Sequence, residues 1–291
     1  MTTLFLPCAS GVESLLADEV QRITGNVAEN ARGGVWVEGD ECTAMQLNLE
    51  SRLAQRVLWP LVDGPYRDEH DLYALARRVP WPQWITPEQS LRVDVSAQRS
   101  PLTSLNFAAL RIKDAVCDSL RESTGARPGV DTRRPDLPLA LFVGPEHATL
   151  YADTSGEALF KRGWREDTGE APLKETLAAA MLAAAGWQGR AEDGPLFDPC
   201  CGAGTIAIEA AQIACGIAPD NTHTGRTAQR VRELWQRRLL GGYELDPADV
   251  LGEGFEDARR DMVVIRGIAV HGVCPHHLVP FRGLAHVCLL Y

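Results

Sequence analysis

The sequence has 291 residues, a formal net charge of −10 and a hydrophobic content of 45%. This length predicts about two domains, with ample apolar side chains for folded cores. No run of roughly 20 apolar residues is present, so a membrane-spanning helix and a membrane partner are not expected. The acidic balance argues against binding nucleic acid through bulk charge, although a local basic face is compatible with it. The first residues lack a basic stretch and the eight cysteines show no disulfide pattern, so a cytoplasmic location is expected.

Basic residues gather in two segments of this acidic chain. The first segment holds Arg92, Arg99, Arg111, Lys113, Arg121, Arg127, Arg133 and Arg134, and the second holds Lys161, Arg162 and Arg165. From charge alone, a solvated surface is the simpler interpretation of both segments.

Residues 1–62 predict a small α+β unit. The expected elements are a strand over 4–6, a helix over 11–24 that ends before Gly25, a strand over 34–38 and a second helix over 48–58. Residues 63–155 predict a second α+β unit. Its expected elements are a strand over 91–95, a helix that Ser104 caps and Gly125 closes, and a last strand within 149–156.

Residues 172–211 predict a different arrangement, in which a helix over 172–186 precedes a strand, a loop and another helix. The strand ends at Asp198, Gly202 and Gly204 form the loop, and the helix starts near Thr205. Glycines suit a backbone that passes close to a ligand, and the first turn of a helix offers free N–H groups. An ordinary strand-to-helix turn explains the same residues, because Gly-x-Gly alone is a weak signal.

Three blocks of the sequence resemble one enzyme family. They are Asp198-Pro-Cys-Cys-Gly-Ala-Gly-Thr205, Lys161-Arg-Gly-Trp-Arg165 and Gly169-Glu-Ala-Pro-Leu-Lys-Glu-Thr-Leu-Ala-Ala-Ala180. They are similar to the family that joins a THUMP RNA-binding domain to a guanine-N2 methyltransferase acting on large-subunit ribosomal RNA. That family usually has D-P-M-C-G-S-G-T in the first block, so Cys200 and Ala203 are departures, and both are small or soft enough for the loop.

This resemblance implies the fold and the partners. It implies an α+β ferredoxin-like part over 1–62, an α+β THUMP domain over 63–155, and the first part of an α/β Rossmann-like methyltransferase domain over 156–220. The cofactor would be S-adenosyl-L-methionine and the partner structured 23S ribosomal RNA, with no DNA partner expected. Protein partners and the oligomeric state stay open.

The resemblance also implies site residues. The cofactor-binding set is Asp198, Pro199, Gly202, Gly204, Thr205 and Lys174. The RNA-binding set is Asn106, Arg111, Lys113, Arg162 and Arg165, for which a solvated surface is the alternative. The family also uses a later acidic residue and an Asn-Pro-Pro-aromatic motif, and the sequence contains no Pro-Pro pair. We therefore expect a methyltransferase domain truncated before its catalytic motif.

Residues 226–291 resemble a second family, GTP cyclohydrolase I. The similarity centres on Cys274-Pro-His-His-Leu-Val-Pro-Phe281, where the family usually has C-E-H-H-L-L-P-F. It implies an α+β fragment in which Cys274 and His277 bind zinc and His276 is the catalytic acid–base residue. A zinc site normally takes at least three protein ligands, and that family's third ligand lies further downstream.

Three functional classes follow from these resemblances. The first is an RNA-binding protein of methyltransferase ancestry, and the second is an enzyme of pterin biosynthesis that uses the C-terminal segment. The third is a composite with one folded domain, joined near residues 215–226. Residues 1–155 are expected to fold alone and to bind RNA in a salt-dependent way.

Overall fold

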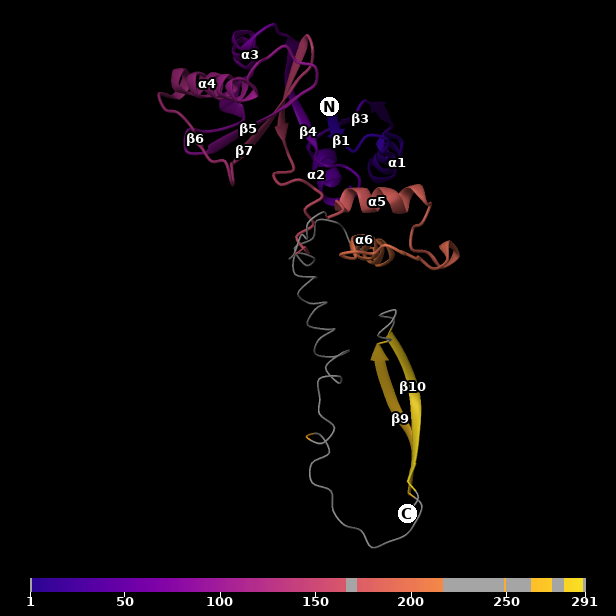
Figure 1. The fold of residues 1–291 in the computed structure, drawn as a ribbon. Coiled ribbons are helices and arrows are strands. Elements are labelled where there is room, and N and C mark those ends of the chain that lie inside the picture. The colour runs from indigo at the N-terminus through magenta and orange to yellow at the C-terminus, as the bar shows by residue number, and fades with distance from the viewer. Residues whose placement is uncertain (1, 166–171, 217–248, 250–262, 274–279, 290–291) are drawn as a thin grey trace. The chain divides into compact units, whose positions relative to one another are not determined.

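The computed structural model describes residues 2–165, 172–216, 249, 263–273 and 280–289. It divides the chain into two compact units, residues 1–222 and residues 223–291. Figure 1 traces the first unit from indigo through magenta to orange and the strands of the second unit in yellow. The first unit carries both the sheet and the glycine loop.

The first part of this unit alternates strands and helices. Its elements are β1 (Thr2–Pro7), α1 (Glu13–Thr24), β2 (Ala28–Ala31), β3 (Gly34–Gly39), α2 (Glu41–Glu50) and β4 (Leu58–Pro65). The helix expected over 11–24 is confirmed, and it ends where Gly25 takes a left-handed conformation with φ of 77°.

The helix expected over residues 48–58 is wrong, because α2 ends at Glu50. Asp40 starts α2 early by accepting a hydrogen bond from the backbone N–H of Thr43. After α2 the chain turns inward, where the buried carboxylate of Glu19 accepts hydrogen bonds from the Ser51 hydroxyl and the N–H of Leu53. These long-range bonds satisfy backbone groups that a continuing helix would have paired locally.

The next part builds a second layer of helices on strands. Its elements are α3 (Glu69–Ala76), the 3-10 helix η1 (Trp81–Gln83), β5 (Ser90–Ala97), α4 (Leu105–Thr124), β6 (Gly129–Val130), β7 (Leu137–Val143) and β8 (His147–Asp153). The prediction for α4 is confirmed at both ends. The Ser104 hydroxyl accepts from the N–H of Phe107 at 3.2 Å, and Gly125 has φ of 82°. The expected strands over 91–95 and within 149–156 are β5 and β8.

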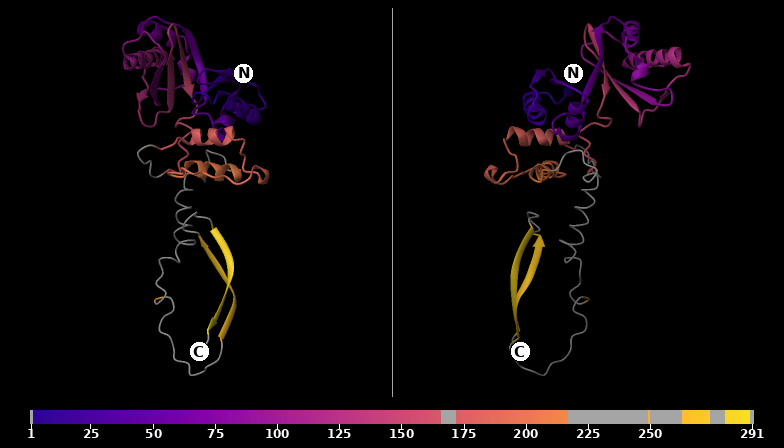
Figure 2. Two further views of the ribbon diagram at one scale, coloured as in Figure 1. Left: turned by 45° about the vertical axis from the view of Figure 1, so that its right-hand side comes forward. Right: turned by 180° about the vertical axis from the view of Figure 1, so that it is seen from behind.

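The eight strands that the structure describes in the first unit form one mixed sheet, in the order β2-β3-β1-β4-β8-β7-β5-β6. β5 runs parallel to β6 and β7, and the other pairs are antiparallel. One core lies under α1 and α2 and a second under α3 and α4, and Trp59 of β4 packs against both. Figure 2 shows the two helical layers on this sheet from two further sides.

Two further helices complete the described part of the first unit. They are α5 (Glu175–Ala184) and α6 (Thr205–Ala214), with the 3-10 helix η2 (Ala191–Asp193) between them. α5 starts three residues later than expected. Its Ala179 and Ala180, together with Leu159, belong to the core under α1 and α2. The first helix of this segment is therefore part of the N-terminal core.

The strand expected before Asp198 is not formed in the structure. Residues 195–198 have no strand conformation, and Leu196 and Phe197 are 38% and 85% exposed. A strand is stabilised by hydrogen bonds to a neighbouring strand, and no strand pairs with these residues in the described part of the chain. The helix expected from Thr205 is confirmed as α6.

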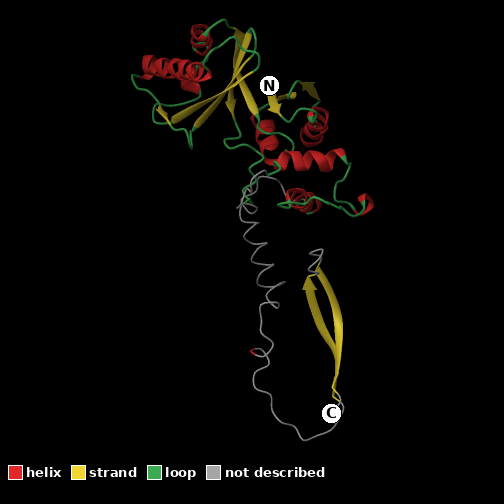
Figure 3. Cartoon of the chain, viewed as in Figure 1, coloured by secondary structure: helices red, strands yellow, loops and turns green. Residues whose placement is uncertain are grey.

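The second unit contains an antiparallel hairpin, β9 (Val263–Val273) and β10 (Pro280–Leu289), which Figure 3 colours as strands. Apolar side chains on both strands are exposed, among them Ile265 and Leu284. Across both units, none of the helices that the structure describes has the length and apolarity needed to cross a bilayer.

Candidate functional site: the glycine loop and its supports

The loop before α6 bends through two glycines with positive φ. Gly202 has φ of 50° and Gly204 has φ of 75°, a region that residues with a Cβ rarely adopt. Gly204 is the N-cap of α6, and its N–H donates to the carbonyl of Cys201 at 2.7 Å. Among the described residues no side chain caps α6, so the N–H groups of its first turn could bind an electron-rich ligand.

Asp198 lies at the start of this loop, and only one of its carboxylate oxygens accepts a hydrogen bond from the described residues. Its Oδ1 accepts a hydrogen bond from the N–H of Cys200 at 3.0 Å, which fixes the carboxylate. Its Oδ2 is buried and has no hydrogen-bond partner among the described residues. A buried acceptor without a partner is costly unless a donor arrives, so the segment that leads into α6 holds an acceptor that a ligand donor could fill.

The side chain of Arg165 forms hydrogen bonds that fix the start of α6. Its Nε donates to Glu175 at 2.9 Å, and its Nη2 donates to the Leu173 carbonyl at 2.9 Å and the Thr205 hydroxyl at 3.0 Å. The guanidinium also lies over the ring of Trp164, 5.0 Å from its centroid. Arg165 therefore ties the first residue of α6 to the first turn of α5.

A buried network of Glu209, Arg162 and Arg52 fixes the middle of α6. Glu209 is fully buried and accepts from Arg162 Nε at 3.3 Å and from Arg52 Nη1 at 3.4 Å. Arg162 Nη2 in turn donates to the carbonyl of Arg52 at 2.8 Å. Burial raises the pKa of Glu209, and the two arginines oppose this rise. The network links α6 to the segment after α2, so the ferredoxin-like part and the loop-bearing helix are joined by charge as well as by packing.

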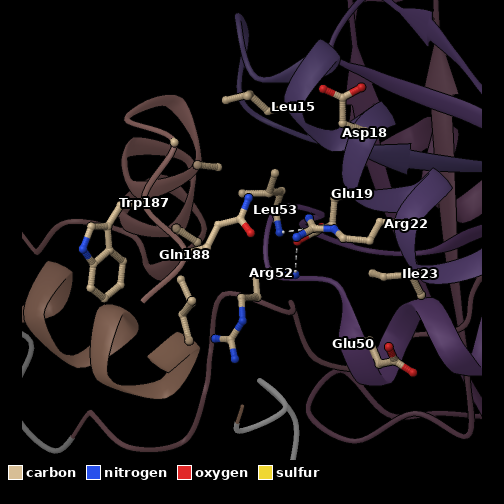
Figure 4. A pocket seen from close by; sticks show the side chains of 14 residues that line it. Leu15, Asp18, Glu19, Arg22, Ile23, Glu50, Arg52, Leu53, Trp187 and Gln188 are labelled. Carbon is tan, nitrogen blue, oxygen red and sulfur yellow. Dashed lines mark hydrogen bonds between the residues drawn. The ribbon is translucent and has the colours of Figure 1, made fainter. Parts of the chain in front are cut away.

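A hollow of about 670 Å³ lies beside this network (Figure 4). Figure 4 shows Asp18, Glu19 and Arg22 of α1 on one side, and Trp187 and Gln188 on the other. Its lining mixes carboxylates and guanidinium groups and includes no residue of the glycine loop. The hollow therefore marks the junction between α1 and the segment after α5, and the loop is a separate feature.

The structure brings together part of the expected cofactor set. Asp198, Pro199, Gly202 and Gly204 follow one another in the loop. Thr205 is buried and its hydroxyl is held by Arg165, so Thr205 supports the helix start. Lys174 is exposed and its ammonium lies over the ring of Phe160 at 5.0 Å.

The expected RNA-binding residues divide into two groups. Arg162 is buried and Arg165 is half-buried, and they pair with Glu209 and Glu175 respectively. Both are structural ion-pair residues, so the expectation that they face RNA needs correction. The other three residues lie on α4. Asn106 is exposed, whereas Arg111 and Lys113 are half-buried beside Asp114. The guanidinium of Arg111 also lies over the ring of Tyr73 at 4.6 Å.

The expected zinc ligands Cys274 and His277 and the expected catalytic His276 lie outside the described residues. Within the described residues, no group of three or more His, Cys, Asp or Glu could hold a metal ion.

Three family models match successive parts of the chain. The RlmL ferredoxin-like domain matches residues 3–58, the THUMP domain matches residues 66–153, and the RMKL-like methyltransferase domain matches residues 162–263. The chain therefore contains a ferredoxin-like domain and a THUMP domain followed by a methyltransferase segment. The third match overlaps the first part of the segment that resembles a cyclohydrolase, which begins at residue 226.

Individual relatives agree with these matches. The chain is 44% identical over 219 residues to the ribosomal RNA large subunit methyltransferase K/L of Syntrophotalea carbinolica. The aligned region covers 75% of this chain and 31% of that protein. The chain thus spans about a third of the length of this curated relative. Among solved structures, it resembles a predicted N6-adenine-specific DNA methylase from Listeria monocytogenes, with a TM-score of 0.67 and 29% identity over 80% of this chain and 63% of that one. It also resembles SMU.472, a putative methyltransferase complexed with SAH, with a TM-score of 0.66 and 27% identity over 75% of this chain and 57% of that one.

Proposed function

We propose that the chain is part of an S-adenosylmethionine-dependent guanine-N2 methyltransferase of 23S ribosomal RNA. Its ferredoxin-like domain, THUMP domain and methyltransferase segment support this proposal. In this proposal residues 1–155 bind RNA and residues 156–220 begin the cofactor site. The THUMP match and the name of the curated relative support ribosomal RNA as the partner. A cytoplasmic location is part of the same proposal.

The observation that carries the cofactor proposal is the left-handed Gly204 at the start of α6, in the same loop as Asp198, whose Oδ2 has no partner among the described residues. The methionine end of S-adenosylmethionine carries an ammonium, which suits an acidic acceptor, and a carboxylate, which suits helix N–H donors. Asp198, Gly202 and Gly204 would hold this end, with Pro199 and Lys174 at its border. The bound cofactor would supply an electrophilic methyl group.

Cofactor binding by this chain is expected to be weak. Residues 195–198 have no strand partner in the described part of the chain, so the entry to the loop is not held rigidly. The test is a titration of ¹⁵N-labelled protein with S-adenosylhomocysteine. Saturable amide shifts at Gly202, Gly204 and Thr205, lost in Asp198→Ala, are expected. Calorimetry that gives a micromolar Kd would contradict weak binding, and an absence of shifts at the loop would contradict the site itself.

RNA binding has its own test, because it involves other residues. Asn106, Arg111 and Lys113 of α4 are proposed as contacts, and α4 is anchored to the sheet by Ile112, Val116 and Leu120. A gel-shift series with a 23S rRNA fragment should give affinity that falls steeply as salt rises. No binding at low salt would contradict the RNA-binding role and leave the cofactor proposal standing.

The C-terminal segment carries a second candidate, a GTP cyclohydrolase I activity at residues 226–291. The observation that favours it is the hairpin β9–β10, whose strands flank the Cys-Pro-His-His segment 274–277. Cys274 and His277 would bind zinc there and His276 would act as the acid–base residue. Purified protein with one zinc per chain, lost in Cys274→Ser, would support this candidate. Protein without zinc that fails to convert GTP would remove it.

A further inference from the structure

A groove of about 1150 Å³ is lined by four separate segments, which lie within residues 55–56, 92–94, 132–135 and 156–161. The lining includes five cations, Arg56, Arg92, Arg133, Arg134 and Lys161, and two carboxylates, Asp94 and Glu157. The whole chain has a net charge of −10. The groove is therefore locally cationic although the whole protein is acidic, and a local cluster of cations attracts polyanions.

The cations of the groove differ in how far they are already paired. Arg92 donates to Asp94 at 2.9 Å and to the Thr132 carbonyl at 3.2 Å. Arg56 pairs with the buried Asp153, and Lys161 lies 3.9 Å from Glu157.

Arg133 and Arg134 are different. Both are exposed, and within the described residues neither guanidinium forms a salt bridge with a carboxylate, although the charge of Arg134 acts on nearby Asp131. They are therefore the groove's available charges.

The turn that carries these two arginines is held in place. Asp131 Oδ1 accepts from the backbone N–H of Arg133 at 2.7 Å and of Arg134 at 3.0 Å. The N–H groups of Arg134 and Arg133 lower the pKa of Asp131, so this acceptor stays ionised at neutral pH. The bond from Arg92 to Thr132 ties the same turn to β5. A fixed backbone lowers the entropic cost of presenting the two guanidinium groups to a ligand.

We propose that this groove binds the phosphate backbone of RNA, with Arg133 and Arg134 as its main contacts. The inference rests on the proposed RNA-binding function and adds the place of contact. Guanidinium groups bind phosphate in a bidentate way. The groove runs from β5 of the THUMP domain to residues 156–161, which lead into Arg162 and the methyltransferase segment. An RNA backbone lying in this groove would pass from the THUMP domain toward α6, the helix that follows the glycine loop.

The test compares two double variants of the full chain that lose the same charge from the same domain. The test variant is Arg133→Ala with Arg134→Ala. The matched control is Arg121→Ala with Arg127→Ala, whose exposed guanidinium groups both pair with Asp118, at 3.2 and 3.0 Å. Binding of a short fluorescein-labelled RNA hairpin is followed by anisotropy between about 50 and 200 mM salt. Thermal unfolding confirms that each variant is folded.

The readout is the slope of log K against log salt, which counts phosphate contacts. The Arg133/Arg134 variant should lose about 1.5 from the magnitude of this slope, and the control should lose close to zero. An equal loss in both variants, or a larger loss in the control, would overturn the groove as the binding track. Failure of the unmodified chain to bind at low salt is a different result, and it would remove the RNA-binding proposal together with this inference.

Discussion

The guanidinium of Arg162 donates to Glu209 across 3.3 Å, and both side chains lie inside the protein. Arg162 leads into the methyltransferase segment, and Glu209 lies on the helix that follows the glycine loop. With Arg52 they form a charged contact between the ferredoxin-like part and α6. A residue expected to face RNA therefore connects two parts of the protein.

Replacing Glu209 by Gln should lower the free energy of unfolding by about 3 kcal/mol, because Arg162 stays buried without a counter-charge. Urea unfolding measures this change. The matched control is Glu192→Gln, which removes a carboxylate 69% exposed in its pair with Arg190. That variant should stay within about 0.5 kcal/mol of the unmodified chain. Equal stability of both variants would show that the buried pair does not stabilise α6.

Ending the chain at residue 155 should destabilise the ferredoxin-like part, contrary to the expectation that residues 1–155 fold well alone. Such a chain lacks Leu159, Ala179 and Ala180, which pack in the core under α1 and α2. The loss of Leu159 burial alone corresponds to about 2 kcal/mol. Hydrogen exchange of α1 amides should be faster than in a chain that ends at residue 216. Unchanged exchange would mean that α5 adds nothing to this core.

Arg165→Lys should loosen the start of α6. An ammonium cannot reach Glu175, the Leu173 carbonyl and the Thr205 hydroxyl together, so buried acceptors lose their donor, at a cost of about 2 kcal/mol. A lower Tm and smaller amide shifts at Thr205 on titration with S-adenosylhomocysteine are expected. Arg190→Lys, at an exposed site, is the control and should change neither quantity. A normal titration in Arg165→Lys would exclude a role in positioning the loop.

Lys113→Ala should weaken RNA binding less than Arg133→Ala. The Lys113 ammonium lies 3.1 Å from Asp114, so its charge is partly compensated, whereas Arg133 has no carboxylate partner in the part of the chain that the structure describes. Both single variants are compared by anisotropy titration with the same RNA at the same salt concentration. A larger loss of affinity for Lys113→Ala would place the main contact on α4.

Features that depend on near neighbours in the chain could be predicted from the amino-acid sequence. Helix ends at Gly25, Ser104 and Gly125 were predictable, because capping requires only residues within a few positions. The bend through Gly204 into α6 was predictable for the same reason. The three blocks within residues 161–205 also indicated a family that joins a THUMP domain to a methyltransferase.

Which polar groups are buried and which are exposed became clear from the three-dimensional fold. Glu19 holds residues 51–53 out of a helix, and Arg162 meets a carboxylate 47 residues away. The basic groove joins segments as distant as Arg56 and Lys161, so its two available arginines could not be told from the other cations in the sequence. Ion pairing, strand pairing and burial depend on partners far along the chain, and local sequence does not specify which partner is present.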